Sequence, residues 1–303
     1  MARFLPLLAA GCRAGASYKA AVVEYSPKLA PRQNVSVEEA SGYTAANWEE
    51  LRGLVAEAAE LGCDIVVLPE YGVVGDGVGS HGSDNEEWTR DGVSSFCEVV
   101  PDPDPNKPLC VETTDEYPGV AVLAACAAKA SNVTLVVNVL EREACGHCKD
   151  GRKQFNTALV FNPRGCLVAK YRKRHLWGLE RYYLDAGPKG DATFETDFGV
   201  TFGVMICFDL VFEFFPSKDV RHYVFPTDWV NAAPRDAVVE TALQAQRLWS
   251  RVHGKVLLAS NYGGFGKDSS GTAIWADGEA LATFFNPSND ESKPQILVAD
   301  VPI

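Results

Sequence analysis

A cysteine stands where a predicted buried strand ends, in the stretch GVMICFDLVFE at residues 203–213. The apolar run VMI leads directly into Cys207, and FDL then begins a new segment. Such a run is typical of a core strand in an α/β sheet, and ligands of these sheets collect beyond the carboxyl ends of the strands. A free cysteine is also among the most often buried residue types, where it acts as a small hydrophobe. Cys207 is therefore a candidate nucleophile whose assignment depends on the side chains that join it.

Glu70 and Lys173 occupy the same kind of position. Glu70 follows the continuous apolar run DIVVL at residues 64–68, and Lys173 follows a predicted strand at 166–171. A thiolate attacks a carbonyl carbon, an ammonium can lower the pKa of the thiol and stabilise the oxyanion, and a carboxylate can shuttle the proton. Each residue alone has an ordinary interpretation, Glu70 as a cap and Lys173 as a solvated cation. Together with Cys207 they are sufficient for acyl transfer.

A histidine base would indicate a different cysteine chemistry. The histidines stand at positions 81, 147, 175, 222 and 253, and none lies in a local signature of a Cys/His hydrolase. The Glu/Lys/Cys set is therefore favoured over a Cys/His pair.

The elements that must hold these side chains alternate between strand and helix, which indicates an α/β fold. Strands are predicted at 20–24, 64–68, 134–139, 156–161, 166–171, 222–226, 256–260 and 296–301, with a hairpin from 271 to 285 around Asp277-Gly278. Helices are predicted after a Thr44 cap through Leu61, at 119–130, and at 234–253 behind Pro234. Residues 72–118 read as long loops, and we find neither a linker nor a repeat. We expect one domain over residues 17–303.

The charge and hydrophobicity of the chain limit the kinds of partner that it can bind. The 303-residue chain is 47% hydrophobic and carries 40 acidic against 28 basic residues, for a formal charge of -12. Such a chain offers little to neutralise phosphates, so we expect no nucleic acid partner. No apolar run approaches the roughly 18 residues that a bilayer span requires. We expect no membrane span.

The first 16 residues resemble a signal peptide. Arg3 gives a basic start, an apolar stretch follows, and Ala14-Gly15-Ala16 offers a cleavage site before Ser17. A buried first strand is the alternative for this segment. Two sequons, at Asn34 and Asn132, are candidate glycosylation sites, although such triplets also occur by chance. The combination favours a secreted, extracellular glycoprotein.

The chain has nine cysteines. Cys97 with Cys110, and Cys145 with Cys148, are plausible local disulfides. Cys12 would be removed with the signal peptide, and with Cys207 free seven cysteines remain, so at least one more must be unpaired. The sequence CGHC at 145–148 could instead indicate a redox or metal site. We see no second ligand pair at a compatible spacing, so we expect no metal.

The chain resembles the nitrilase superfamily of carbon-nitrogen hydrolases, and within it the vanin (pantetheinase) and biotinidase branch. The resemblance runs over nearly all of residues 18–285. It is carried by LPEYGVVG at Glu70, DGRKQFNTALVFNPRGCLVAKYRKRHLW leading to Lys173, MICFDLVF at Cys207, PTDWVNAAP at Trp229, and LLASN at Asn261.

This resemblance implies a four-layer α-β-β-α sandwich and an enzyme without a cofactor. It implies Glu70 as general base, Lys173 as the cationic partner of the tetrahedral intermediate and Cys207 as nucleophile, with Glu180 as a supporting glutamate. It also implies that Asp228 and Trp229 contact the substrate.

Two departures from the branch concern the pocket: Asp228 replaces a small residue, and Tyr71 replaces an acidic one. Vanins and biotinidase also continue into a C-terminal base domain, which we expect to be absent here, and a homodimer is expected instead. The resemblance implies a secreted amidase that hydrolyses a linear non-peptide carboxamide, with pantetheine giving pantothenate and cysteamine as first choice. Biocytin hydrolysis is the alternative within the class. A non-catalytic relative that binds amides or vitamins is the alternative outside it.

Overall fold

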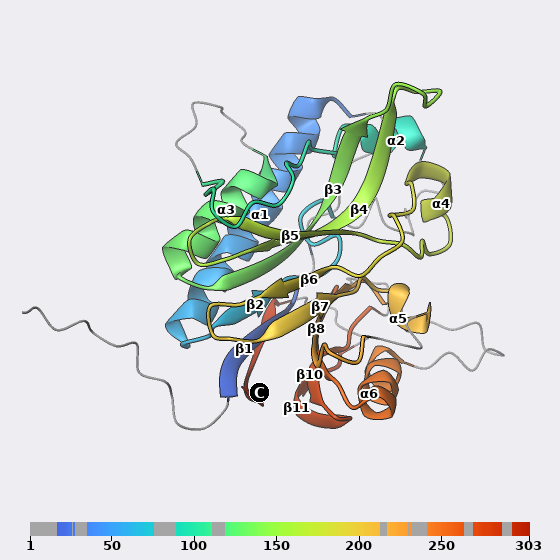
Figure 1. Cartoon of the computed structure of the whole chain (residues 1–303). Helices are drawn as coiled ribbons and strands as arrows, with labels where there is room; N and C mark the ends of the chain where they lie inside the picture. The colour runs from blue at the N-terminus through green and yellow to red at the C-terminus, as the bar shows by residue number, and fades with distance from the viewer. Residues whose placement is uncertain are drawn as a thin grey trace, which may run out of the picture.

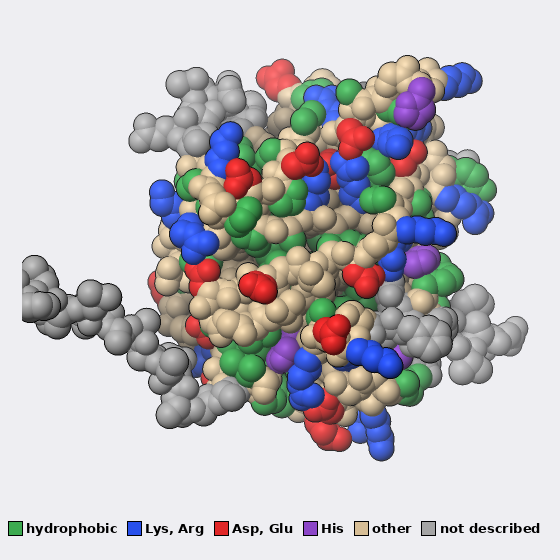
Figure 2. Space-filling view, viewed as in Figure 1, with side chains coloured by type: hydrophobic (Ala, Val, Ile, Leu, Met, Phe, Trp, Pro, Cys, Tyr) green, Lys and Arg blue, Asp and Glu red, His purple; other side chains and the backbone are tan. Residues whose placement is uncertain are grey.

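The structure, a computed structural model, describes residues 17–25, 27, 35–75, 89–110, 119–212, 217–229, 231, 241–263, 269–286 and 293–303. In this part of the chain two six-stranded sheets lie face to face, and helices cover their outer faces (Figure 1). The expected α-β-β-α sandwich is confirmed. Acidic and basic side chains are interspersed over the face drawn in Figure 2.

The first sheet has the strand order β12-β1-β2-β3-β4-β5. Its strands are β1 (Ser17–Glu24), β2 (Ile65–Val67), β3 (Thr134–Ala144), β4 (Arg152–Phe161), β5 (Leu167–Arg172) and β12 (Gln295–Pro302). β1, β2 and β3 are parallel to one another, whereas β3, β4 and β5 are linked by antiparallel pairings. β5 therefore runs in the same direction as β2, and the carboxyl ends of the two strands share one edge of the sheet.

The second sheet has the order β11-β10-β9-β8-β7-β6. Its strands are β6 (Thr193–Glu195), β7 (Thr201–Val204), β8 (His222–Thr227), β9 (Val256–Asn261), β10 (Thr272–Ala276) and β11 (Glu279–Phe284). β7, β8 and β9 are parallel. The hairpin between β10 and β11 turns at Asp277 and Gly278, whose φ angles are 54° and 82°, so the predicted turn is confirmed.

Three apolar layers hold the sandwich together. Alternate residues of β1 show the division: Ala21 and Val23 face the helices α1 (Val37–Glu60) and α3 (Val120–Ser131), while Ala20 and Val22 face the second sheet. The outer face of the second sheet packs against α6 (Ala242–His253), mainly through Trp249. The central strands are covered on both faces, which explains why their sequences are continuous apolar runs.

The helix starts differ from those predicted. α1 begins behind Ser36, which forms a capping box with Glu39, and not behind Thr44, whose hydroxyl bonds to the carbonyl of Ser41 inside the helix. α6 begins behind Thr241 with a second capping box, while Pro234 lies outside the described residues. The short helices α2 (Arg90–Ser94), α4 (Glu180–Tyr183) and α5 (Asp209–Phe212) were not expected from the sequence.

Disulfide pairing partly corrects the prediction. Cys145–Cys148 is present as expected, but Cys110 bonds to Cys126 rather than to Cys97. The reason is that α3 carries Cys126 to a Cα–Cα distance of 4.6 Å from Cys110, whereas Cys97 is a buried thiol directed at the carbonyl of Val93. The described free cysteines are Cys63, Cys97, Cys166 and Cys207, in agreement with the expected surplus.

Part of the secretion prediction falls outside the described residues, namely the segment 1–16 and Asn34. Asn132 is exposed, in a left-handed conformation at the end of α3. Among the described helices, none combines the length and the apolar character that a bilayer span requires.

Candidate active site

Lys173 lies between two carboxylates at the shared edge of β2 and β5. Its Nζ is 2.7 Å from Glu70 Oε1 and 2.9 Å from Glu180 Oε2, and all three side chains are buried to within 2%. Glu70 follows β2, Lys173 follows β5, and Glu180 is the first residue of α4. A cation with 1% exposure cannot be a solvated surface lysine, which removes the ordinary interpretation of this residue.

An amide that the sequence analysis missed bridges the same two carboxylates. Asn156 Nδ2, from β4, is 2.7 Å from Glu70 Oε1 and 3.0 Å from Glu180 Oε1. Asn138 of β3 orients it, since Asn138 Nδ2 donates to Asn156 Oδ1 over 2.6 Å. Both asparagines are fully buried within otherwise apolar strand runs, TLVVNV and FNTALVF. A polar amide inside such a run was the signal that could have identified them.

Glu180 is held from two further sides. The hydroxyl of Tyr71 donates to Glu180 Oε1, and the backbone N–H of Trp177 donates to Oε2 over 2.6 Å. Tyr71 has a φ of 56°, and its own N–H donates to Asn138 Oδ1 over 2.9 Å. Tyr71, one of the two residues that differ from the family branch, therefore contacts Glu180 and not Glu70 through its side chain.

Cys207 sits on a tight turn between β7 and α5. Its φ is 43°, in the left-handed region that a side chain with a Cβ rarely adopts, which costs on the order of 1 kcal/mol. Asp209 stabilises this turn: its carboxylate accepts the N–H of Ile206 over 3.1 Å and the hydroxyl of Tyr171 over 2.8 Å. The turn presents the thiol beyond the end of the strand, as the sequence predicted.

Asp228 connects the thiol to the carboxylate. Its backbone N–H donates to Glu70 Oε2 over 2.8 Å, and its carbonyl accepts from Cys207 Sγ at 3.6 Å. Trp229 follows, with its N–H 2.8 Å from Asn261 Oδ1. Asp228 and Trp229 directly follow β8, and both make these contacts through the backbone: Asp228 with Glu70 and Cys207, and Trp229 with Asn261.

Burial and neighbouring charges set the pKa values of the set. Burial raises the pKa of Glu70, against the opposing effect of Lys173, and the nearby Glu180 raises it further. Burial would lower the pKa of Lys173, but Glu180 and Glu70 raise it well above its usual range. Burial and the charge of Glu70 raise the pKa of Cys207 well above that of a free thiol, and Lys173 only partly opposes them. Lys173 lowers the pKa of the thiol, as the sequence led us to expect, but burial and Glu70 outweigh this effect.

The described histidines serve other partners. His175 Nδ1 is 2.8 Å from Asp209 Oδ1, and His222 Nδ1 is 3.0 Å from the hydroxyl of Tyr18. These two rings thus bond to Asp209 and Tyr18 and not to Cys207, and His81 lies outside the described residues. In the described part of the chain, the group of potential metal ligands is Cys145, His147 and Cys148, and its two sulfurs are bonded to each other.

Two comparisons concern sequence. The family model described as carbon-nitrogen hydrolase matches residues 19–215, which include Glu70, Lys173 and Cys207. The chain is 32% identical over 308 residues to the biotinidase of Takifugu rubripes, covering 95% of this chain and 57% of that protein. It is 32% identical over 291 residues to the pantetheinase of Canis lupus familiaris, covering 91% and 54%. The chain thus spans a little over half the length of the curated relatives that it matches.

The comparison with solved structures supports the fold alone. An amidase from Nesterenkonia sp. superposes with a TM-score of 0.64 at 16% identity, covering 95% of this chain and 92% of that one. The family model covers more than half of the chain, and the relatives above 30% identity cover nearly all of it. The chain belongs to the carbon-nitrogen hydrolase family.

Proposed function

We propose that the chain is an amidase that hydrolyses a linear, non-peptide carboxamide through a thioester on Cys207. The observation that carries this proposal is the buried ammonium of Lys173, which lies against Glu70 and Glu180 and interacts electrostatically with the thiol of Cys207. A buried charge that is paired with carboxylates and acts on a nearby nucleophile is typical of a reactive site.

In the first half-reaction Cys207 Sγ attacks the amide carbon, and Glu70 accepts the thiol proton. A proton acceptor is needed because the raised pKa of Cys207 keeps the resting thiol protonated. Lys173 stabilises, by this proposal, the negative charge that develops on the substrate oxygen. Glu70 then returns the proton to the leaving nitrogen, the C–N bond breaks, and the amine departs.

In the second half-reaction water attacks the thioester carbon while Glu70 again takes a proton. The C–S bond breaks, Cys207 regains a proton from Glu70, and the acid product leaves. Asn156 and the N–H of Asp228 donate to different oxygens of Glu70 and thereby hold the carboxylate in one orientation through both steps. This division of labour makes Glu70 the proton carrier and Lys173 a fixed charge.

We propose pantetheine as the substrate, cleaved to pantothenate and cysteamine. The support is the similarity to pantetheinases at 30–32% identity over more than 90% of this chain. Biocytin is the alternative, because the similarity to biotinidases is of the same strength. Asp228 and Tyr71, which depart from the branch, lie at the thiol and at Glu180 respectively, and are the positions where the two substrates would be distinguished.

We also propose that the protein acts outside the cell. Two disulfides in the described residues fit an oxidising compartment, and Asn132 is exposed at the start of a sequon. Intact mass before and after enzymatic deglycosylation tests this. An unglycosylated, fully reduced protein recovered from the cytosol would contradict it.

The test of function is a steady-state assay on pantetheine and biocytin side by side. We expect hydrolysis of pantetheine, and no measurable turnover by Cys207→Ala at an unchanged melting temperature. Cys207→Ser should be nearly inactive, because a hydroxyl is much harder to ionise in this setting. Faster turnover of biocytin than of pantetheine would make biocytin the assigned substrate. Turnover of neither by folded protein would favour a non-catalytic binding role, and an active Cys207→Ala would remove the nucleophile.

A further inference from the structure

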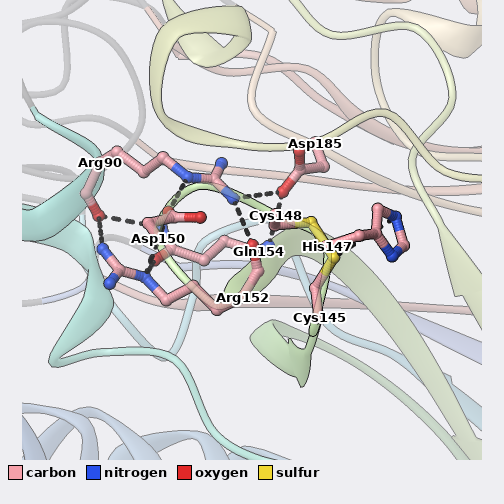
Figure 3. The surroundings of a disulfide bond; sticks show 8 residues. All are labelled: Arg90, Cys145, His147, Cys148, Asp150, Arg152, Gln154 and Asp185. Atoms are coloured by element: carbon pink, nitrogen blue, oxygen red, sulfur yellow. Dashed lines mark hydrogen bonds and ion pairs between the residues drawn. A yellow bond between two sulfur atoms is a disulfide. The ribbon is translucent and has the colours of Figure 1, made fainter.

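The turn between β3 and β4 carries a disulfide that the amidase chemistry does not use. Cys145 and Cys148 are three residues apart, with His147 between them (Figure 3). We propose that this turn is a thiol–disulfide exchange site for low-molecular-weight thiols, in which Cys148 is the sulfur that is attacked and Cys145 is the leaving sulfur.

The bond is not required to close the turn. The N–H of Cys145 donates to the carbonyl of Gly151 over 2.8 Å, the N–H of Gly151 donates to the carbonyl of Cys148 over 3.1 Å, and Ala144 pairs with Arg152 in the strand register. A cross-link over so few residues in a turn that is already closed removes little chain entropy. This disulfide is therefore expected to add little to the free energy of unfolding.

The second disulfide provides the contrast. Cys110–Cys126 joins residues 16 apart and connects a loop to α3, so it restricts a much larger part of the unfolded chain. The same molecule thus contains one disulfide suited to structure and one whose position suits chemistry.

The two sulfurs of the turn differ in access. Cys145 is 5% exposed, whereas Cys148 is only partly buried and lies between the exposed residues His147 and Lys149. At Gly146 a Cβ would meet no atom within 4 Å, so this side of the turn is open. Figure 2 shows a histidine and basic side chains at the end of the β3–β4 hairpin. A thiolate arriving from solvent reaches Cys148 first, and the adjacent basic groups favour its approach.

His147 is placed to serve the leaving sulfur. Its Nε2 is 3.6 Å from Cys145 Sγ, within the distance of a bond to sulfur. An imidazole that carries a proton there can give it to the Cys145 thiolate as the S–S bond breaks, which makes the departure easier. The exchange therefore has an attacking side at Cys148 and a protonating side at Cys145.

The reaction balances with the thiol as the only reductant. A small thiol RSH loses its proton to solvent, its sulfur bonds to Cys148 Sγ, and the electron pair of the broken S–S bond goes to Cys145 Sγ, which takes a proton from His147. A second RSH attacks the RS–Cys148 mixed disulfide at the sulfur of R, giving RSSR and the Cys148 thiolate. Two thiols are oxidised, and one protein disulfide is reduced.

Contacts outside the disulfide keep the turn in place while its bond is open. Arg90 reaches across from α2 and binds Asp150 at 2.5 Å, Asp185 at 2.7 Å and the carbonyl of Arg152 at 2.9 Å (Figure 3). Gln154, fully buried on β4, donates to the carbonyls of Arg90 and Tyr183. With this frame the reduced cysteines remain near each other, and the bond can form again.

The test uses the full chain in a Cys207→Ala background, which removes the proposed amidase nucleophile. The folded protein is incubated with reduced glutathione, quenched with an alkylating agent, and mapped by peptide mass spectrometry. We expect Cys148 to carry glutathione, Cys145 to be alkylated, and Cys110–Cys126 to remain bonded under the same conditions. Equal resistance of both disulfides, or glutathione on Cys145, would overturn the proposal.

Two variants separate exchange from folding. His147→Ala should slow glutathione uptake at Cys148 about tenfold or more, while its melting temperature stays unchanged. The double variant Cys145→Ser/Cys148→Ser should fold with a melting temperature within a few degrees of the parent, since backbone bonds close the turn. Unchanged exchange in His147→Ala removes its role. Unfolding of the double variant would make the bond structural and contradict the argument.

Discussion

At the scale of single residues, the charge of Lys173 is the centre of the site. Its ammonium is shared by Glu70 and Glu180, so removing or reshaping it leaves two buried carboxylates in contact with an incomplete partner. A buried ionic group that loses its partner typically costs several kcal/mol. Lys173 is thus required both for the charge balance of the site and, by our proposal, for the oxyanion.

Lys173→Arg keeps the charge but changes its shape. A planar guanidinium does not replace a compact ammonium between two carboxylates, so we expect kcat/KM to fall about 100 to 1,000-fold. Because the site is fully buried, the larger side chain should also cost about 1 to 3 kcal/mol of stability. The control is Lys170→Arg, whose lysine contacts Glu141 at 3.1 Å outside the site. Near wild-type turnover of Lys173→Arg would remove Lys173 from the reaction.

Asn156→Ala tests the positioning of Glu70. The hydrogen bond from Asn156 lowers the pKa of Glu70, so its loss raises that pKa further. If ionised Glu70 is the base, the acidic limb of the kcat/KM profile should move to higher pH, with a drop of about tenfold or more in the plateau.

Thr157→Val is the matched control for Asn156→Ala, because the buried hydroxyl of Thr157 bonds to Glu141 on the neighbouring strand and not to the site. It should leave the acidic limb in place. A profile of Asn156→Ala that keeps the wild-type limb would show that the amide serves packing alone.

The sequence was sufficient to predict that Cys207, Glu70 and Lys173 lie beyond strand ends, because each follows a recognisable apolar run. It was not sufficient to find Asn138 and Asn156, because a polar residue inside a strand reveals a buried network only when its partners are known. It indicated the lowering effect of Lys173 on the thiol pKa, but not the burial and the charge of Glu70 that raise this pKa. The sequence identified the chemical groups of the site, but it did not reveal the burial and the neighbouring charges of each group.

At the scale of elements, the half-buried carboxylate of Glu98 contacts the start of α3. Glu98 accepts the N–H of Ala121 at 3.3 Å, and its backbone pairs with β3 on either side of Glu141. A Cβ at Gly119 would lie 2.3 Å from Glu98 Oε2, so only glycine leaves room for the contact. Burial raises the pKa of Glu98 from 4.5 to about 7.

This pKa makes the stability of the fold depend on pH. Since the folded-state pKa lies above the unfolded value, the contribution of Glu98 is fully present below the unfolded pKa and is lost as pH rises through about 7. Glu98→Gln should remove this loss, so the variant should be about 1 to 3 kcal/mol more stable than wild type at about pH 8.5 and nearly equal at about pH 5.

Urea unfolding at the two pH values measures the effect of Glu98→Gln. Glu60→Gln, at an exposed position at the end of α1, is the control and should change neither value. A Glu98→Gln difference that is the same at both pH values would contradict the raised pKa.

The elements were predicted to different degrees for identifiable reasons. Strands such as β8 and β9 are continuous apolar runs between turn residues and were placed within a residue. The start of α1 was missed because Thr44 was taken as the cap, although Ser36 and Glu39 form a capping box in the sequence itself. The partner of Cys110 was missed because it depends on how α3 lies against a loop, which no local pattern specifies.

At the scale of the whole molecule, apolar side chains gather at the exposed surface of α4 and α5. This α4–α5 patch consists of Trp177, Leu179, Tyr182, Val211 and Phe212, which are 40% to 63% exposed. Phe208 directly follows Cys207. The ring centroids of Trp177 and Phe212 lie 4.7 and 5.0 Å, respectively, from that of Phe208. Exposed apolar side chains gathered in this way are typical of an interface.

We expect the chain to form a homodimer through the α4–α5 patch. Light scattering coupled to sizing chromatography should give the dimer mass at micromolar concentration, and Tyr182→Lys should shift it towards the monomer. Val252→Lys changes an equally exposed apolar residue, 67% exposed on α6 and outside the patch, and should leave the mass unchanged. A wild-type monomer at micromolar concentration would rule out this assembly.

The pairing of β1 with β12 has a consequence in time. Ser17 of β1 lies opposite Pro302 of β12. One edge of β1 therefore has no partner strand until β12 has been synthesised. At about 5 to 20 residues per second, this delay is roughly 15 to 60 s on the ribosome. During this interval the long apolar strand β1 presents a free edge to other chains. A ribosome-bound chain arrested before β12 should therefore remain sensitive to protease, and one released with β12 should become resistant.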